Sequence, residues 1–440
     1  MVPRSLSPSP APLDAGGPVP AKPTGIASAA MGAPPAVRPL RVLMVAPTSF
    51  FLDYGCHVRI LEEARVLQGL GQRVAIVTYA NGQDVPGLDI RRGLTLPWRR
   101  EYEVGSSRHK LGLDLFLSAA ALRAAGDFRP DLIHGHLHEG ALIGGAVARV
   151  FGKPLVFDFQ GSLTGEMVDH GFLRREGRVY GPMRRLERWI DHLPAVILHS
   201  SRNAAEHLRD DFGVPERRLF SLPDFVNTAV FRPDLLTPAE REAERAALGI
   251  PPGRQVIAYL GLLARHQGTD LLLEAARQVV AARPDSHFLV MGFPGMDRYA
   301  AQAAALGIAG HVTFTGRVPY AQAPRRLALG DIAVAPKIAE TEGSGKLMNY
   351  MAMGLPTVAF DLPVCREYLG AEALNVPPGD AGGFAAAILG LLADPGAAAA
   401  MGRRLRRRAE EEYDWSRGGG ILLEAYDRAR RSRDLRAAVA

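Results

Sequence analysis

Short apolar runs alternate with amphipathic stretches along most of the chain from residue 41 onward. Brief apolar runs that stop at proline or at polar loops are typical of buried strands, and apolar positions three and four residues apart are typical of covering helices. The predicted strands are 41–46, 74–79, 132–134, 155–159, 195–199, 256–260, 288–291, 312–314, 332–335 and 357–360. The predicted helices are 59–70, 141–151, 174–190, 238–248, 269–282, 299–306, 346–353, 381–392 and 413–428. The alternation favours an α/β fold with doubly wound parallel sheets.

The alternation breaks between residues 222 and 238, where proline, aspartate and asparagine accumulate. This break predicts two Rossmann-like domains, 40–225 and 226–412. Residues 1–39 hold ten of the 33 prolines and predict a disordered tail. Ligand sites of such domains lie outside the carboxyl ends of the strands. If those ends face each other, a cleft forms, and the loops expected to line it are 47–57, 134–140, 159–165, 261–268, 292–297 and 337–346.

Composition changes this picture little. The 440 residues are 47% hydrophobic, enough for two cores, and no run approaches the roughly 18 apolar residues of a membrane span. A net charge of +6 favours anionic partners, but no nucleic-acid-binding module is recognisable, so we expect no nucleic acid partner. The two cysteines, Cys56 and Cys365, lie far apart and favour a cytoplasmic location.

The stretch 331–361 has the pattern strand, glycine-rich loop, helix, strand. Its loop contains Glu342, Gly343 and Gly345, and Lys346 stands at the start of the helix. Backbone N–H groups at a helix N-terminus suit an anion, most often a phosphate. The alternative is one more βα loop without a ligand.

Three histidines, His134, His136 and His138, occupy alternate positions around the end of a predicted strand. Two of them could reach one metal ion, but no further ligand group at metal spacing is apparent, so no metal site is predicted. His136 is expected to hydrogen-bond a ligand hydroxyl, with a structural role as the alternative. The sequence has no Walker A loop, no G-x-S-x-G elbow and no G-x-G-x-x-G after the first strand, which argues against an ATPase, a serine hydrolase and an NAD oxidoreductase.

Four segments resemble, in the same order, signatures of the retaining GT-B glycosyltransferases of family 4. They are LPDFVNTAVFRP at 222–233, GLLARHQGTDLL at 261–272, EGSG at 342–345 followed by YMAMGLPTV at 350–358, and the final helix with Trp415 and Tyr426. The resemblance covers about residues 41–430. It implies two Rossmann-like domains that face each other across a cleft, with the final helix, 413–436, packed back onto the first domain.

The resemblance also implies a reaction, in which a sugar passes from a nucleotide diphosphate sugar to an acceptor with retention at the anomeric carbon. The donor would bind the second domain and an unidentified acceptor (a glycan, a lipid or a small molecule) the first, without a cofactor or metal. Glu342 and His136 would be the catalytic residues. The donor-binding residues would be Gly55, Gly261, Arg265, Gly343, Gly345, Lys346 and Asn349.

The sequence departs from the family pattern at the donor phosphates. The family's arginine and lysine match Leu262 and Gln267, and its second glutamate matches Asn349. Arg265 and Lys346 are the cations at hand to replace them. Without replacement, each lost charge-assisted hydrogen bond would cost about 1.5–3 kcal/mol. The alternative is a non-catalytic GT-B protein that binds a glycan or a partner transferase.

The predicted helix 174–190 is rich in arginine and contains Trp189. Basic amphipathic helices can lie on an anionic bilayer, so contact with the inner face of the membrane is an open alternative. The preferred interpretation is a helix that covers the sheet and points its arginines toward water.

Overall fold

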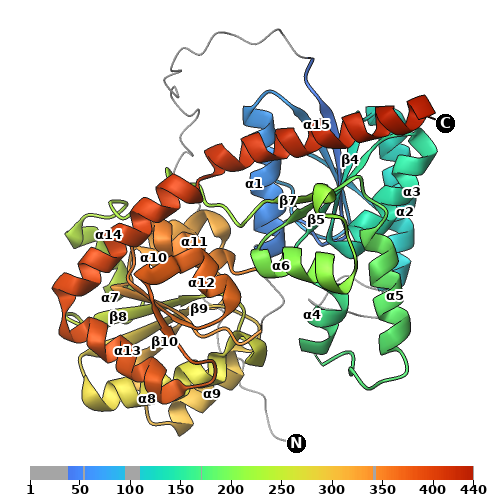
Figure 1. Cartoon of the computed structure of the whole chain (residues 1–440). Helices are drawn as coiled ribbons and strands as arrows, with labels where there is room; N and C mark the ends of the chain where they lie inside the picture. The colour runs from blue at the N-terminus through green and yellow to red at the C-terminus, as the bar shows by residue number, and fades with distance from the viewer. Residues whose placement is uncertain (1–37, 53–54, 95–109, 170, 340–342, 440) are drawn as a thin grey trace, which may run out of the picture. The chain divides into compact units, whose positions relative to one another are not determined.

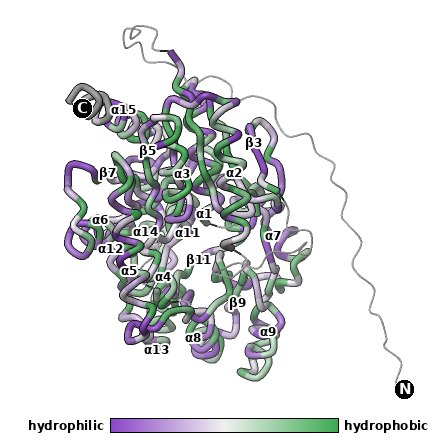
Figure 2. Tube along the Cα trace, turned by 90° about the vertical axis from the view of Figure 1, so that its right-hand side faces the viewer, coloured by the Kyte–Doolittle hydropathy of each residue, from purple (hydrophilic) through white to green (hydrophobic). Residues whose placement is uncertain are grey.

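The computed structural model describes residues 38–52, 55–94, 110–169, 171–339 and 343–439, and the side chains of these residues except 110, 111 and 433–439. The predicted tail, 1–39, therefore lies almost wholly outside the described residues. The described chain forms two parallel sheets with helices packed against them (Figure 1), and Figure 2 shows the hydropathy of each residue along the same trace. The predicted α/β class with two parallel sheets is confirmed.

The first sheet has seven parallel strands in the order β3-β2-β1-β4-β5-β6-β7. Its strands are β1 Arg41–Ala46, β2 Arg73–Thr78, β3 Asp89–Arg92, β4 Leu132–His136, β5 Leu155–Phe159, β6 Val196–His199 and β7 Leu219–Ser221. Its helices are α1 Gly55–Gly69, α2 Lys110–Phe128, α3 Leu137–Phe151, α4 Leu163–Asp169, α5 Tyr180–Asp191 and α6 Arg202–Glu206. Val42 and Met44 of β1 join the core formed with α1, whereas Leu43 and Val45 join the core formed with α2 and α3. Both faces are therefore covered, as the apolar β1 sequence requires.

The second sheet has six parallel strands in the order β10-β9-β8-β11-β12-β13. Its strands are β8 Gln255–Leu260, β9 Ser286–Met291, β10 Val312–Phe314, β11 Ile332–Ala335, β12 Thr357–Phe360 and β13 Leu374–Val376. Its helices are α7 Pro238–Ala247, α8 Thr269–Ala282, α9 Met296–Ala305, α10 Ala323–Leu327, α11 Gly345–Ala352, α12 Pro363–Leu369, α13 Ala381–Ala393 and α14 Pro395–Glu412. In both sheets the strand order reverses beside the first strand, at β1/β4 and at β8/β11.

The last helix, α15 Trp415–Val439, packs against the first sheet (Figure 1). Trp415, Leu422 and Tyr426 are buried in the same core as Val42 of β1. The Tyr426 hydroxyl also lies 2.8 Å from Nδ1 of the buried His134. The C-terminal segment thus contributes both apolar and polar contacts to the first sheet.

Three local predictions were wrong. The helix predicted from residue 174 begins at Tyr180, because turns at Gly171 and Gly177 occupy the preceding residues. The first helix begins at Gly55 instead of residue 59. The expected loop 134–140 is absent, since β4 continues to His136 and α3 starts at the next residue. The sequence pattern also missed β3, whose sequence DIRR is too polar to read as a strand, and the long helix α2. Further missed elements are short: β7, β13, α4, α6, α10 and α12.

Among the described helices, none is by itself long and apolar enough to cross a membrane. Helices α13 and α14 reach that length and composition only as a pair, which is bent by 103° at their junction.

Gly268 allows the loop after β8 to pack against the end of β11, which generates a stability prediction. Gly268 and Gly249 have nearly the same backbone angle, φ of +73° and +72°. A Cβ on Gly268 would lie 1.7 Å from the carbonyl oxygen of Pro336, whereas one on Gly249 would meet nothing within 4 Å. We expect Gly249→Ala to lower the free energy of unfolding by about 1–2 kcal/mol, the cost of a left-handed alanine. Gly268→Ala should lower it by about 1–3 kcal/mol more, because the backbone must move. Urea denaturation checks this pair, and equal losses would contradict the close packing.

Candidate functional site

The two reversals of strand order mark where a doubly wound sheet opens a crevice for a ligand. In the second sheet this position lies between the loop after β8, 261–268, and the loop after β11, of which residues 336–339 and 343–344 are described. Backbone N–H groups of Ile338 and Ala339 both donate to the carbonyl oxygen of His266, at 3.1 Å each. The two loops are therefore held together by their own backbones.

Lys346 connects the same two loops through its side chain. It is the second residue of α11, and its ammonium donates to Oε1 of Gln267 at 2.9 Å. The ammonium also lies 4.6 Å from the centre of the Tyr259 ring, a cation–π distance. A Cβ on Gly261 would stand 2.6 Å from this nitrogen, so the glycine leaves room for it. Lys346 thus reaches the residue, Gln267, that matches the lysine of the family pattern.

Among the described residues, the other predicted donor-binding residues of the second domain form no hydrogen bond with the Lys346 side chain. Arg265 lies in the short 3-10 turn Arg265–Gln267 of the same loop. It is exposed, and its guanidinium forms no hydrogen bond or ion pair with another described residue. Gly343 approaches Asp224, whose Oδ2 would lie 2.7 Å from an added Cβ. Gly345 begins α11 and is exposed, and Asn349 is half-buried on the same helix. Glu342, the predicted catalytic carboxylate, lies outside the described residues.

Two polar side chains at this helix start were not predicted. Lys337 is 1% exposed, and its ammonium donates to the carbonyl oxygen of Gly343 at 3.0 Å. Ser344 directly precedes α11, and its buried hydroxyl oxygen has no hydrogen-bond partner among the described residues. A buried polar atom without a partner at a helix N-terminus is suited to a ligand anion. Lys337 lies two residues after the end of β11 at Ala335, and this position at a strand's carboxyl end was the signal in the sequence that could have identified it.

In the first domain, His136 ends β4 and is fully buried. Its Nδ1 lies 3.1 Å from Oδ2 of Asp158, and its ring stacks on His134 at 4.3 Å. Its Nε2 has no hydrogen-bond partner among the described residues. The next residue, Leu137, has a φ of +59°, a costly conformation for a leucine that here turns the strand directly into α3. Asp158 therefore orients His136 and leaves Nε2 available, although the side chain is enclosed and does not line an open surface.

Arg59 holds the Asp158 carboxylate in place. Its guanidinium donates to Asp158 at 2.8 Å and to the carbonyl oxygen of Leu222 at 2.9 Å, and it lies 3.2 Å from Glu63. Burial alone would raise the pKa of the Asp158 carboxyl, but Arg59 and His136 outweigh it and bring that pKa well below its usual value. Burial raises the pKa of Glu63 well above its usual value. Arg59 and His136 therefore favour the charged form of Asp158, whereas burial disfavours the charged form of Glu63.

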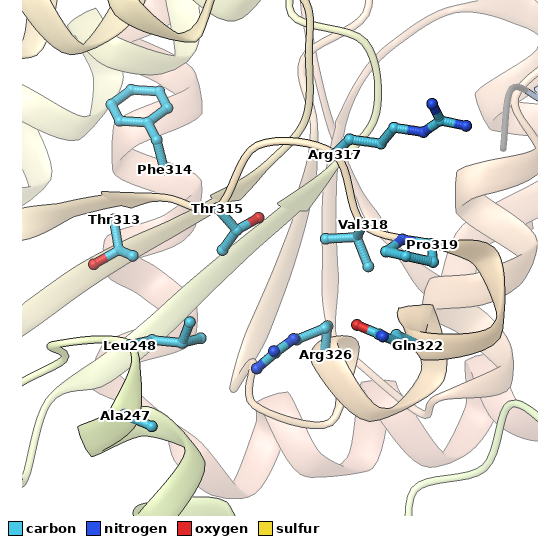
Figure 3. A pocket seen from close by; sticks show the side chains of 10 residues that line it. All are labelled: Ala247, Leu248, Thr313, Phe314, Thr315, Arg317, Val318, Pro319, Gln322 and Arg326. Carbon is cyan, nitrogen blue, oxygen red and sulfur yellow. The ribbon is translucent and has the colours of Figure 1, made fainter. Parts of the chain in front are cut away.

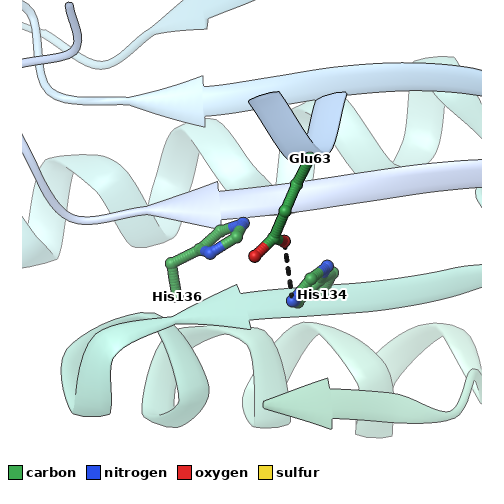
Figure 4. A group of neighbouring side chains, drawn as sticks. All are labelled: Glu63, His134 and His136. Atoms are coloured by element: carbon green, nitrogen blue, oxygen red, sulfur yellow. Dashed lines mark ion pairs between the residues drawn. The ribbon is translucent and has the colours of Figure 1, made fainter. Parts of the chain in front are cut away.

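Glu63, His134 and His136 converge on one point, as Figure 4 shows. One possible ligand atom from each lies within 4.8 Å of the others, with Glu63 and His134 3.7 Å apart. These donor types suit Zn²⁺, but the neighbouring guanidinium of Arg59 already supplies a positive charge there. The absence of a metal requirement stays a prediction.

A second buried cluster joins His138 of α3 to Glu187 and Asp191 of α5. Nε2 of His138 lies 3.3 Å from Asp191 and 3.7 Å from Glu187. Burial opposes a charge on His138, but the two carboxylates outweigh it and raise the pKa of the imidazole to about 9. Glu187 also accepts hydrogen bonds from the hydroxyls of Ser162 and Thr164. The ion pairs of His138 connect α3 to α5.

Two further features lie apart from these contacts. Gly55, expected to approach the donor phosphates, is the first residue of α1, and a Cβ there would meet nothing within 4 Å. A surface hollow of about 370 Å³ lies between α7, β10 and α10 (Figure 3). Arg317, Arg326 and Phe314 are among the residues that line it, and none of the predicted site residues does.

Two family descriptions match the chain. "Glycosyl transferase 4-like domain" matches residues 54–224, and "Glycosyl transferases group 1" matches residues 254–394. Together they cover more than half of the chain. The chain is a glycosyltransferase of family 4.

Known glycosyltransferases resemble it over nearly its whole length. The phosphatidyl-myo-inositol mannosyltransferase of Mycolicibacterium smegmatis is 27% identical over 393 residues, which are 88% of this chain and 94% of that protein. The sucrose-phosphate synthase of Thermosynechococcus elongatus has a TM-score of 0.75 at 19% identity, with 91% of this chain and 100% of that chain covered. The HepE protein of Anabaena, solved with UDP-glucose, has a TM-score of 0.71 at 16% identity, with coverages of 88% and 99%. The last two likenesses establish the GT-B fold of this glycosyltransferase.

The cluster at His138 generates a pH prediction for the glycosyltransferase. The folded-state pKa of about 9 exceeds the ordinary value of 6.5, so the ion pairs stabilise the fold fully below pH 6.5 and progressively less up to pH 9. The contribution lost over this range is about 3 kcal/mol. Urea unfolding at pH 6, 7.5 and 9.5 should show this decline in the native protein and not in His138→Gln. The difference between the two profiles isolates the contribution of His138. Parallel profiles for the native protein and His138→Gln would contradict the charged state of His138.

Proposed function

We propose that the enzyme transfers a sugar from a nucleotide diphosphate sugar to a hydroxyl of its acceptor, with retention at the anomeric carbon. The observation that carries this proposal is the contact of Lys346 with Gln267. This contact brings the Lys346 ammonium to Gln267, the loop position where the family pattern has a lysine. We propose that Lys346 supplies the positive charge that the family's lysine supplies in other members. The unpartnered hydroxyl of Ser344 and the N-terminus of α11 lie in the same loop and support an anion there.

The proposed chemical task of this site is to stabilise the negative charge that develops on the diphosphate as the anomeric carbon–oxygen bond breaks. A fixed ammonium does this better than a mobile one, since little reorganisation is needed during the reaction. Lys346 meets that condition because Gln267 and Tyr259 hold it from two sides. Arg265 is exposed and would have to move, which makes it the weaker contributor. Glu342 and Asn349 keep their proposed contacts with the donor sugar and its ribose.

The first domain would supply the acceptor side, where His136 is the proposed contact to a sugar or acceptor hydroxyl. Its Nε2 lacks a partner, and Asp158 fixes the orientation of the ring. The relative named above acts on phosphatidyl-myo-inositol, which supports an acceptor with several ring hydroxyls. We propose that class for this enzyme as well. The reaction would need no metal, and a cytoplasmic location fits a nucleotide sugar donor.

Lys346→Met is expected to weaken the binding of a nucleoside diphosphate by about 10- to 150-fold, the loss of one charge-assisted hydrogen bond of about 1.5–3 kcal/mol. Calorimetric titration with UDP, GDP, ADP and TDP measures this and identifies the base. Arg265→Met should have a smaller effect.

The matched control restores the charge from the other loop. In Lys346→Met/Gln267→Lys, the ammonium returns on the residue that Lys346 contacts, and affinity should recover to within a few-fold of the native value. If none of the four nucleotides binds the native protein, the donor proposal fails. If Lys346→Met binds as tightly as the native protein, the role of Lys346 fails. The anomeric configuration of the product, read by NMR, tests retention.

A further inference from the structure

Large apolar side chains are exposed along one continuous segment, residues 172–193. They are Phe172, Val179, Leu186, Trp189 and Leu193, with 53%, 59%, 39%, 53% and 36% of their surface exposed. This segment comprises the turns before α5, the helix itself and the residues just after it. Exposed apolar residues that gather in one segment indicate an interaction surface, whereas isolated ones do not.

The anchoring of α5 explains why its apolar residues point outward. The inner face of the helix carries Glu187, Ile190 and Asp191, all buried. Glu187 and Asp191 pair with His138 of α3, so charges as well as apolar contacts fix the helix to the domain. Leu186 and Trp189 are therefore left on the outer face. The expectation that this helix merely covers the sheet and shows arginines to water was incomplete, because it also shows apolar side chains to water.

The same segment is strongly basic. It contains six arginines, and Glu176 is its exposed carboxylate. Arg184 turns inward, 4.7 Å from the Phe212 ring and 3.8 Å from Asp211. The other five arginines are exposed and form no ion pair with another described residue, and they are Arg174, Arg175, Arg178, Arg185 and Arg188. The surface therefore combines free guanidinium groups with a half-exposed indole and aliphatic side chains.

We propose that residues 172–193 dock the enzyme on an anionic lipid bilayer. Guanidinium groups bind lipid phosphates, while tryptophan, phenylalanine and leucine enter the boundary between headgroups and acyl chains. A soluble anion would use the arginines and leave the apolar residues in water, and a protein partner of ordinary surface composition would not need so many like charges. The segment follows α4, which begins shortly after the carboxyl end of β5. Docking would therefore bring the bilayer to the edge of the first sheet where its ligand loops lie.

Vesicle binding tests the proposal with two charge-matched variants. The native protein should bind vesicles of phosphatidylcholine with phosphatidylglycerol much more tightly than vesicles of phosphatidylcholine alone. Arg175→Glu/Arg178→Glu should weaken that binding by about 25-fold or more, since each arginine near an anionic surface is worth about fivefold. The control, Arg403→Glu/Arg407→Glu, makes the same charge change at exposed arginines of α14 and should bind within a few-fold of the native protein.

The variant Trp189→Ala tests whether apolar side chains enter the bilayer or whether charge attraction alone holds the protein on the vesicle. It should weaken vesicle binding at high salt, where charge attraction is screened, more strongly than at low salt. Equal binding of the native protein to neutral and anionic vesicles would overturn the proposal, and so would equal losses in the two charge-reversed variants. Sedimentation that shows a dimer which Arg175→Glu/Arg178→Glu dissociates would assign the surface to self-association instead. UDP or GDP binding should be unchanged in every variant, so this test succeeds or fails independently of the donor site.

Discussion

The ammonium of Lys346, held between the Gln267 amide and the Tyr259 ring, is the contact on which the proposed donor site depends. It bridges two loops that meet where the strand order of the second sheet reverses. The backbone bonds from Ile338 and Ala339 to His266 fix the distance between those loops. Because the framework is set by backbone packing, the charge can come from either loop without changing the fold. Under the proposed function, this accounts for a glutamine at the position where the family pattern has a lysine.

In the first domain, the candidate residue His136 is also held in place by buried charged side chains. Arg59 keeps Asp158 ionised in a dry interior, and Asp158 in turn orients His136. An unpaired charge at this depth would cost several kcal/mol, so Arg59 and Asp158 stabilise the domain only as a pair. The contact of Arg59 with the Leu222 carbonyl extends this arrangement to the start of the segment that links the two sheets. The His138 cluster is held in the same way, since Glu187 and Asp191 of α5 form ion pairs with His138 of α3.

Local structure was largely predictable from the sequence, and long-range contacts were not. The apolar periodicity of 269–282 predicted α8 with its observed bounds, because the spacing of apolar residues reports which face is buried. The pairing of Lys346 with Gln267 joins residues 79 positions apart, and that of Arg59 with Asp158 joins residues 99 apart. No local pattern records such pairs, since strand order decides which loops meet. Asp158 did carry a usable signal, as a charged residue inside an apolar strand requires a buried partner.

A crystal structure of the protein with bound UDP or GDP, whichever binds more tightly, tests the central claim most directly. We expect the terminal phosphate to lie within hydrogen-bond distance of the Lys346 ammonium, at the N-terminus of α11 and beside the Ser344 hydroxyl. A diphosphate bound away from this loop, with no phosphate oxygen within hydrogen-bond distance of the Lys346 ammonium, would contradict the account.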